Sequence, residues 1–167
     1  MRLVPITAED EQLTVRLECD PEIMVHIGGP RPEAEARAAH RRRLELMGKG
    51  DAYMVKILAD DSNEVLGTIG MWKIDGGSPQ TYEIGWIVAP KHQGKGVATE
   101  AAHRMLKRAR SNPSIRYVNA FPAVSNGASN AIARKIGMTN QGAIDHEGFA
   151  GVMRCNDWCI DLDQVAD

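Results

Sequence analysis

One stretch of the chain, from Tyr82 to Ala109, predicts a strand, a glycine-rich turn and a helix in direct succession. Residues 82–88 have the β-branched and aromatic content of a buried strand. Pro90 ends this strand because proline has no N–H to donate to a neighbouring strand. Beyond the turn, apolar residues recur at helical spacing from Val97 to Ala109. Any fold assigned to the chain must therefore contain this strand–turn–helix unit.

The turn of this unit contains Gly94 and Gly96, which let the backbone approach a ligand closely. The helix that follows offers unpaired N–H groups and a partial positive charge at its first turn. Both features favour a bound anion. The sequence therefore predicts a site for a phosphate or pyrophosphate group at this turn.

Two widespread phosphate-binding loops do not fit the turn. A Walker A loop needs glycine at position 89 and serine or threonine after Lys95, but the chain has Ala89 and Gly96 there. A dinucleotide-binding loop needs a small residue where Thr99 stands, and an acidic residue after the next strand. That strand, predicted over residues 115–121, ends without an acid. The sequence therefore excludes a nucleotide-binding protein of either kind.

The turn instead matches the pattern Gln/Arg-x-x-Gly-x-Gly/Ala through Gln93, Gly96 and Ala98, directly after Glu-Ile-Gly-Trp-Ile-Val. This combination resembles the acetyl-CoA loop of the GCN5-related N-acetyltransferase (GNAT) superfamily. Residues 125–138 resemble the family's later motif, Asn-x-x-Ser followed by a short helix that ends at glycine. The resemblance covers residues 68–138. It implies an enzyme that moves an acetyl group from acetyl-CoA to a primary amine in a ternary complex.

The fold implied by the resemblance is α/β (α+β): a mixed central sheet of about six to seven strands with about four helices on both faces. At 167 residues the chain suits a single domain over positions 1–167. The expected strands are 3–6, 52–59, 65–74, 82–88, 115–121, 139–145 and 152–162, and the expected helices are 7–19, 32–50, 97–109 and 125–137. Pro21 is expected to interrupt the chain, with a loop over residues 25–30.

The resemblance implies a set of donor-binding groups. The residues expected to bind acetyl-CoA are Ile87, Val88, Gln93, Gly94, Lys95, Gly96, Val97, Ala98 and Asn126. Backbone amides from Gly94 to Ala98 are expected to hold the pyrophosphate, with added charge from Lys95. The amide of Val88 or Ile87 is expected to point at the thioester carbonyl. Asn126 is expected to bond the pantetheine arm, although capping of the following helix explains it equally well.

Two side chains are candidates for proton transfer. Glu83 falls where several family members carry a general-base glutamate; the alternative is a charge at a strand edge or a salt-bridge partner. Family members frequently carry a tyrosine that protonates the leaving thiolate, and Ala133 stands in its place. This departure favours the branch that resembles ribosomal-protein alanine acetyltransferases (RimJ/RimL-like). Ser129 is the substitute candidate, with helix capping as its alternative role.

The acceptor is predicted from location alone. Residues expected to line an acceptor pocket are Met24, His26, Ile27, His146, Glu147 and Phe149. Arg37 and Arg41–Arg43 resemble a nucleic-acid patch, but the interspersed glutamates favour a solvated helix face. The acceptor class stays open among a protein N-terminus, an aminoglycoside, a polyamine and an amino acid. A CoA-binding GNAT-fold module without turnover, acting as a sensor or assembly partner, is the alternative function.

Composition limits the remaining possibilities. The net charge is −2, which gives no reason to expect a nucleic-acid partner, and no apolar run is long enough for a membrane span. Three scattered cysteines indicate reduced thiols and a cytoplasmic protein. Because they lack a second Cys/His pair at metal spacing, we expect no metal cofactor. A homodimer is compatible with the sequence.

Overall fold

The computed structural model describes residues 1–74, 80–148 and 151–164. Its strands are β1 (Arg2–Pro5), β2 (Ala52–Leu58), β3 (Val65–Lys73), β4 (Thr81–Val88), β5 (Tyr117–Ala120), β6 (Thr139–Gly148) and β7 (Gly151–Asp161). Its α-helices are α1 (Glu11–Glu18), α2 (Pro21–Met24), α3 (Glu33–Lys49), α4 (Val97–Arg110) and α5 (Gly127–Lys135). Short 3-10 helices, η1 (Ala8–Asp10) and η2 (Pro90–His92), precede α1 and α4.

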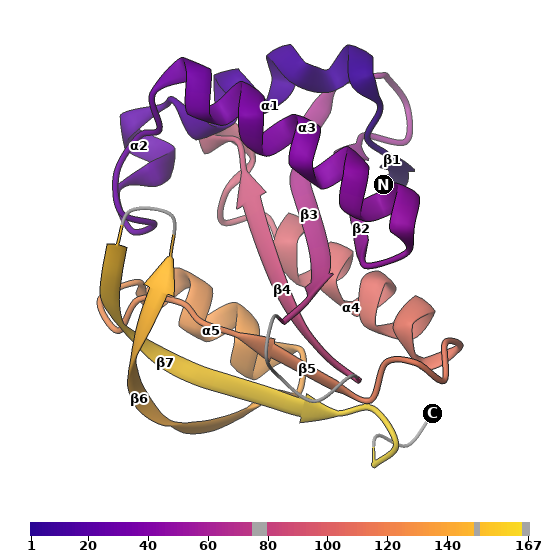
Figure 1. Cartoon of the computed structure of the whole chain (residues 1–167), viewed down its shortest axis with the longest axis vertical. Helices are drawn as coiled ribbons and strands as arrows, with labels where there is room; N and C mark the ends of the chain where they lie inside the picture. Colours follow the sequence, from indigo (N-terminus) through magenta and orange to yellow (C-terminus); the bar gives the residue numbers. More distant parts are fainter. Residues whose placement is uncertain (75–79, 149–150, 165–167) are drawn as a thin grey trace.

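The strands form one sheet in the order β1-β2-β3-β4-β5-β7-β6 (Figure 1). Every neighbouring pair is antiparallel except β4 and β5, which are parallel and connected through α4. Helices α4 and α5 pack together on one face, and α1–α3 cover the other (Figure 1). The predicted fold class, a mixed sheet of about seven strands with helices on both faces, is confirmed.

Alternation along the central strands separates a packed core from a site-forming face. Tyr82 and Ile84 of β4 are buried in the same cluster as Ala101, Met105 and Leu106 of α4. Successive strand residues point to opposite faces, so Glu83, Gly85 and Ile87 face the α1–α3 side. The helical spacing predicted for α4 is confirmed, because its buried residues all lie on the face toward this core.

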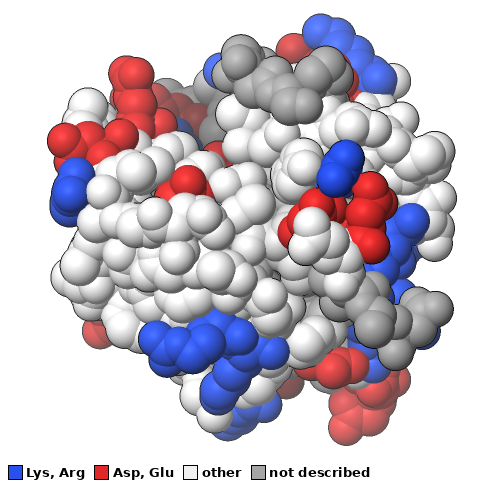
Figure 2. Space-filling view, turned by 90° about the horizontal axis from the view of Figure 1, so that it is seen from below, with Lys and Arg blue, Asp and Glu red and all other residues white. Residues whose placement is uncertain are grey.

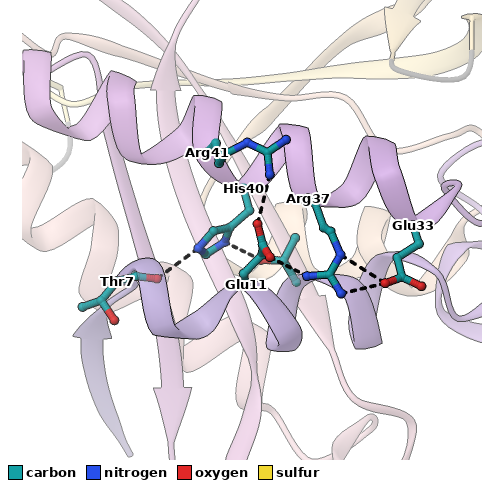
Figure 3. Close-up of polar contacts among 7 residues, drawn as sticks. Thr7, Glu11, Glu33, Arg37, His40 and Arg41 are labelled. Carbon is teal, nitrogen blue, oxygen red and sulfur yellow. Dashed lines mark hydrogen bonds and ion pairs between the residues drawn. The ribbon is translucent and has the colours of Figure 1, made fainter.

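A buried histidine connects helices of the layer formed by α1–α3, called the helical layer below. The His40 side chain, 1% exposed, lies between α3 and α1 (Figure 3). Its Nε2 is 3.0 Å from the Thr7 carbonyl oxygen, an acceptor, so Nε2 donates. In the neutral ring Nδ1 then accepts from the Thr14 hydroxyl at 2.8 Å. These bonds fix the position of α1 relative to α3, and with it the residues of α1 that face the sheet.

The outer side of this layer carries the solvated charges expected for α3. Arg37 pairs with Glu33 and Glu11, and Arg41 with Glu11 (Figure 3). On the face opposite α1–α3, small groups of both signs are separated by wide uncharged areas (Figure 2). No helix of the described ranges is long and apolar enough to cross a membrane.

Four local expectations are corrected. Strand β1 spans Arg2–Pro5, one residue before the range expected for it, and β5 is shorter than predicted at Tyr117–Ala120. Pro21, expected to interrupt the chain, begins the short helix α2, because the Asp20 carboxylate accepts from the N–H groups of the first turn. The helix expected over residues 125–137 is shorter, because α5 spans Gly127–Lys135, and its buried residues are Asn130 and Ala133.

Candidate active site

Strand β4 pairs with β5 only over its first residues. Thr81 to Glu83 pair with Tyr117 to Asn119, whereas β4 stays paired with β3 as far as Val88. The rest of β4 therefore diverges from β5 and leaves an opening between the two strands. This is the splayed strand pair that the family resemblance implies.

The register of β3 and β4 shows which amides face this opening. At the two ends of the ladder, Ala89 N–H donates to the Leu66 carbonyl (2.9 Å) and Ile74 N–H to the Thr81 carbonyl (3.1 Å). Hydrogen bonding alternates along an antiparallel pair, so odd-numbered residues of β4 direct their amides at β3. The amide of Ile87 therefore points at β3, and that of Val88 points at the opening. Of the two expected donors, the register favours Val88.

A cavity of about 410 Å³ adjoins the opening on the α1–α3 side of the sheet. Four of the side chains predicted for the site line this cavity: Glu83, Ile87, Asn126 and Ser129. They come from β4 and from the start of α5, so the fold brings together two motifs that are about 40 residues apart in the chain. Val88, the last residue of β4, and the turn residues 93–98 do not line it.

Glu83 lines the cavity from β4 and carries a titratable carboxyl group. It is partly buried, and desolvation raises the pKa of its carboxyl to about 7. The nearby Trp72 indole N–H opposes this shift, because it favours the charged carboxylate. Among the described residues Glu83 has no salt-bridge partner, so the alternative of a salt-bridge charge is not supported. A carboxyl group with this pKa can exchange a proton near neutral pH.

The Trp72 ring packs against a glycine of the neighbouring strand, Gly85. Trp72 pairs with Glu83 in the register of β3 and β4, and its ring lies over Gly85. A Cβ on Gly85 would come within 2.8 Å of the Trp72 ring, too close for an ordinary contact. The absence of a side chain at 85 therefore leaves room for the edge of the Trp72 ring against β4.

The start of α5 contributes Ser129 and Asn126. The Asn126 side chain is the helix cap, since its Oδ1 accepts from the Ser129 N–H at 3.0 Å. Capping is thus supplied by Asn126, which leaves the Ser129 hydroxyl without the capping role considered for it. Ala133, one turn later, is fully buried in the core and does not line the cavity. Ser129 is therefore the hydroxyl that α5 presents to the cavity.

A buried amide, not singled out from the sequence, fixes α5 beside the cavity. Asn130 Nδ2 donates to the carbonyls of Ala123 (2.9 Å) and Asn126 (2.7 Å). Its Oδ1 accepts from Trp158 Nε1 (2.8 Å) and Asn156 Nδ2 (2.7 Å) on β7. The Asn130 side chain thus donates two hydrogen bonds and accepts two, and the accepted pair connects α5 to β7 of the sheet. The spacing could have indicated it, because Asn130 and Ala133 lie on one helix face.

The glycine turn has the geometry expected of an anion site. Gly94 and Gly96 have φ values of 70° and 80°, and a Cβ at either would meet no atom within 4 Å. Among the described residues, the amides from Gly94 to Ala98 have no acceptor. Gln93 is held in place, because its Nε2 donates to the Val88 carbonyl at 3.0 Å. Lys95 is exposed beside these amides.

The residues expected around the acceptor lie in the same cavity. Met24, His26 and Ile27 line it from α2 and the following loop, and His146 and Glu147 line it from β6. The His146 ring stacks on Phe121 with ring centroids 4.2 Å apart. Burial lowers the pKa of His146, which favours the neutral ring. Phe149, also expected here, lies outside the described residues.

Three charged residues of the cavity were missed as site residues. Glu18, Arg31 and Arg43 line it from the helical layer, and Glu18 is only 4% exposed. Arg43 had been grouped with the solvated arginines of α3, but it turns inward to pair with Glu18. The available signal was Glu18 itself, a charge on the face of α1 that also carries Leu13, Thr14 and Leu17.

The cavity also contains one buried thiol. Cys155 of β7 is 1% exposed, and burial together with the nearby Glu83 charge raises the pKa of its thiol. A thiol rather than a thiolate is a poor nucleophile. The chemistry of the cavity therefore centres on the Glu83 carboxyl and the Ser129 hydroxyl.

A splayed parallel strand pair, a glycine turn at a helix start and a carboxyl group in the adjoining cavity define an acyltransferase type of site. The chain belongs to the GNAT family: residues 1–139 match the family described as acetyltransferase (GNAT) domain. Its enzyme class is that of the N-acetyltransferases. The family and fold implied by the sequence motifs are thus confirmed.

Individual proteins similar to this chain are also described as N-acetyltransferases. The chain is 30% identical over 135 residues to an uncharacterized N-acetyltransferase, YnaD, of Bacillus subtilis (strain 168), covering 80% of this chain and 76% of that protein. It superposes on RimL, a ribosomal L7/L12 alpha-N-protein acetyltransferase solved with coenzyme A, with a TM-score of 0.80 and 19% identity. The match covers 98% of this chain and 94% of the RimL chain. It also superposes on a spermidine N-acetyltransferase of Vibrio cholerae, solved with CoA and spermine, with a TM-score of 0.79 and 17% identity. That match covers 98% of this chain and 96% of the other. Similarity to the RimL fold is consistent with the RimJ/RimL-like branch.

Proposed function

We propose that the protein transfers the acetyl group of acetyl-CoA directly to a primary amine in a ternary complex. The observation that carries this proposal is the position of Glu83. Its carboxyl group, with a pKa raised to about 7, lies in a cavity that adjoins the opening between β4 and β5. The structures solved with coenzyme A support acetyl-CoA as the donor.

The residues present fit acetyl-CoA. The amides from Gly94 to Ala98, at the start of α4, suit the pyrophosphate, and the open space over Gly94 and Gly96 leaves room for it. The pantetheine arm would pass from this turn into the opening between β4 and β5. Asn126 lines the cavity and its Oδ1 caps α5, while its Nδ2 has no hydrogen-bond partner among the described residues and could bond this arm. When bound, acetyl-CoA supplies the activated acyl group.

Each chemical step has a candidate group on this chain. The Glu83 carboxylate takes a proton from the acceptor ammonium, which frees the amine lone pair to attack the thioester carbonyl. The Val88 amide donates to the oxygen that becomes negative. The C–S bond then breaks, and the Ser129 hydroxyl protonates the departing thiolate. The attacking nitrogen gives up its second proton, which restores the Ser129 hydroxyl. The products are an N-acetyl amine and CoA thiol, with one proton released to solvent.

Direct transfer is favoured over an acyl-enzyme. Cys155 is the cysteine of the cavity, and its burial and raised pKa keep it protonated. A covalent route would need a thiolate that could approach the thioester. The amine itself is thus the nucleophile for which the site is built.

Release of CoA thiol from acetyl-CoA tests the function. The acceptors are L-leucine, spermidine, kanamycin and a peptide with a free N-terminal serine, each with the N-acetyl product identified by mass spectrometry. Turnover with at least one amine supports the proposal. Tight CoA binding with no turnover on any of them would instead indicate the alternative, a CoA-binding module that acts as a sensor or assembly partner.

A further inference from the structure

Two glycines lie directly opposite each other in the strand pair that carries Glu83. Gly70 of β3 pairs with Gly85 of β4. The pair formed by Trp72 and Glu83 lies two residues further along the same ladder. Residues two apart on a strand point to the same face, so all four positions face the helical layer and line the cavity. The glycines therefore leave two positions without side chains next to Glu83.

Neighbouring apolar side chains occupy the space over both glycines. A Cβ on Gly70 would lie 2.1 Å from Met54 Sδ, so the thioether lies where a side chain at 70 would begin. The edge of the Trp72 ring covers Gly85 in the same way. Met54 pairs with Gly70 in the register of β2 and β3 and is 9% exposed. Together these cavity-lining residues form one surface, called the apolar patch below: Met54, Gly70, Trp72 and Gly85.

The surroundings of the apolar patch favour an uncharged substituent. From the helical layer, α1 contributes Leu17 and Thr14 to the cavity, and the Thr14 hydroxyl already donates to His40 Nδ1 at 2.8 Å. Moving a charge out of water onto a thioether and an indole ring costs free energy, whereas burying an alkyl or aryl group there is favourable. The charged residues that line the cavity from the helical layer are paired with one another: Glu18, Arg31 and Arg43.

The apolar patch lies within reach of an amine held at Glu83. Directly opposed residues of an antiparallel pair have Cβ atoms about 5 Å apart, and Trp72 is the residue opposed to Glu83. An amine at the carboxyl group therefore has its first carbon atoms within contact distance of the indole. Gly70 and Met54 follow along the same face, so a longer carbon skeleton continues over them.

We propose that the apolar patch binds the carbon skeleton of the acceptor, so that the substrate is a small primary amine with an uncharged alkyl or aryl group. This inference rests on the proposed acetyl transfer and names its acceptor class. The cavity of about 410 Å³ has the size of a site for such a small molecule. Met54 and Trp72 are then specificity-determining residues for the acceptor.

Glu147 is the group that favours a different acceptor, because a second carboxylate in the cavity attracts the second ammonium of a polyamine. Glu147 lies on β6 and is exposed to solvent, where its charge is screened. The positions next to Glu83 on the sheet are uncharged instead: Trp72 and Gly85. A diamine is therefore the acceptor against which the inference is tested.

Matched acceptors test the inference on the unmodified protein. Pentylamine and putrescine have equal numbers of non-hydrogen atoms and the same reacting group, but putrescine has a second ammonium in place of the terminal methyl. With acetyl-CoA as donor, we expect kcat/KM to be at least about 10-fold higher for pentylamine. Equal or better use of putrescine, or of spermidine, would overturn the inference.

Variants at Met54 separate acceptor binding from a structural role. Met54→Gln keeps the length of the side chain but adds an amide. It should lower kcat/KM for pentylamine at least about 10-fold and that for putrescine less than about 3-fold, while Met54→Leu should keep the preference. Met47→Gln is the matched control, because Met47 is a half-buried methionine of α3 outside the cavity. Equal losses for both amines in Met54→Gln would assign Met54 to structure and contradict the inference.

A second variant tests the apolar patch if Met54→Gln does not fold. The methyl group of Gly70→Ala meets the flexible end of Met54 and should displace it into the cavity. Pentylamine should then lose at least about 5-fold in kcat/KM, whereas methylamine, which is too short to reach this place, should change less than about 2-fold. Gly48→Ala on α3 is the control, since a Cβ there meets no atom within 4 Å. Equal losses for both amines in Gly70→Ala would contradict the inference.

The two proposals fail in different ways. Absence of turnover with every amine would contradict the proposed acetyl transfer and, with it, this acceptor class. Turnover without preference for pentylamine over putrescine would contradict only the acceptor class.

Discussion

Trp72 and Glu83 lie directly opposite each other on β3 and β4, which places the indole beside a carboxyl group whose pKa burial raises to about 7. The pairing places an apolar ring beside an acid, which disfavours the charged form. The indole N–H limits this effect by favouring the carboxylate. Trp72 therefore both buries the carboxyl group and moderates the shift of its pKa.

The raised pKa of Glu83 predicts a pH-dependent contribution to stability. In the folded protein Glu83 binds its proton more tightly than in the unfolded chain, where its pKa is near 4.5. Its contribution is therefore present below about pH 4.5 and is lost as pH rises through about 7. Glu83→Gln, which stays neutral, should gain stability relative to wild type between pH 5 and pH 8, by on the order of 1–3 kcal/mol.

Urea unfolding of both proteins at several pH values measures this difference. Glu147→Gln is the control, because Glu147 is an exposed carboxylate of the same cavity. A stability difference between Glu83→Gln and wild type that does not change between pH 5 and pH 8 would contradict the raised pKa.

The glycine turn predicts a selective loss of donor binding. Gly96→Val places a side chain in the space assigned to the pyrophosphate and should weaken CoA binding at least 10-fold by calorimetry. Valine is also strained at a φ of +80°. Gly50→Val is the matched control, since Gly50 has the same φ and equally open surroundings at the end of α3.

Both glycine variants should lose similar stability, about 1–2 kcal/mol, from backbone strain. Only Gly96→Val should lose CoA. Undiminished CoA affinity in a folded Gly96→Val protein would remove the pyrophosphate from this turn.

Ser129 predicts a dependence on the leaving group. If its hydroxyl protonates the thiolate, Ser129→Ala should lower kcat most when departure of the thiol limits the rate, by about 10²-fold or more. An acetyl thioester with a more acidic thiol should be affected much less. Ser125→Ala serves as the comparison, because Ser125 is an exposed serine just before α5 that does not line the cavity. Equal losses with both donors would leave Ser129 without this role.

The hydrogen bonds of Asn130 predict how much unfolding free energy is lost when α5 is no longer bonded to the sheet. Asn130→Ala leaves the Trp158 indole N–H and two backbone carbonyls without their partner, which should cost about 2–4 kcal/mol of unfolding free energy. Asn140→Ala, at an exposed asparagine that accepts only from the Gly142 N–H, should cost at most about 1 kcal/mol. Chemical denaturation compares the two. Similar losses in both would show that the Asn130 bonds contribute little.

Much of the part of the site expected to bind acetyl-CoA could be predicted, because it depends on local backbone geometry. The strand before Pro90, the glycines at 94 and 96 and the helical spacing of α4 are all contained in one continuous segment. Glycine turns and helix starts are determined by neighbouring residues, so a short motif suffices to locate them. The choice between Ile87 and Val88 could not be made in this way, because it depends on the register with β3.

The part of the cavity expected to hold the acceptor amine was predicted less well, because it forms between segments that are distant in the sequence. Arg43 was placed on a solvated face, since its neighbours Arg41 and Arg42 are exposed and its partner Glu18 lies on another helix. Pro21 predicts a break in the chain, although an acid before proline is also a typical helix start, as it is here. Such pairings between helices leave little trace in sequence spacing.

The pH dependence of kcat in wild type and Glu83→Gln, with acetyl-CoA and a saturating amine, tests the central claim most directly. We predict that wild-type kcat rises with pH through about 7, as Glu83 becomes a carboxylate able to accept the proton. Glu83→Gln should lack this inflection, fall about 10²–10⁴-fold in kcat at neutral pH, and recover as the amine deprotonates at higher pH. CoA affinity should be unchanged. A variant that keeps more than about a third of wild-type kcat at pH 7, with the same pH profile, would contradict the assignment of Glu83 as the base.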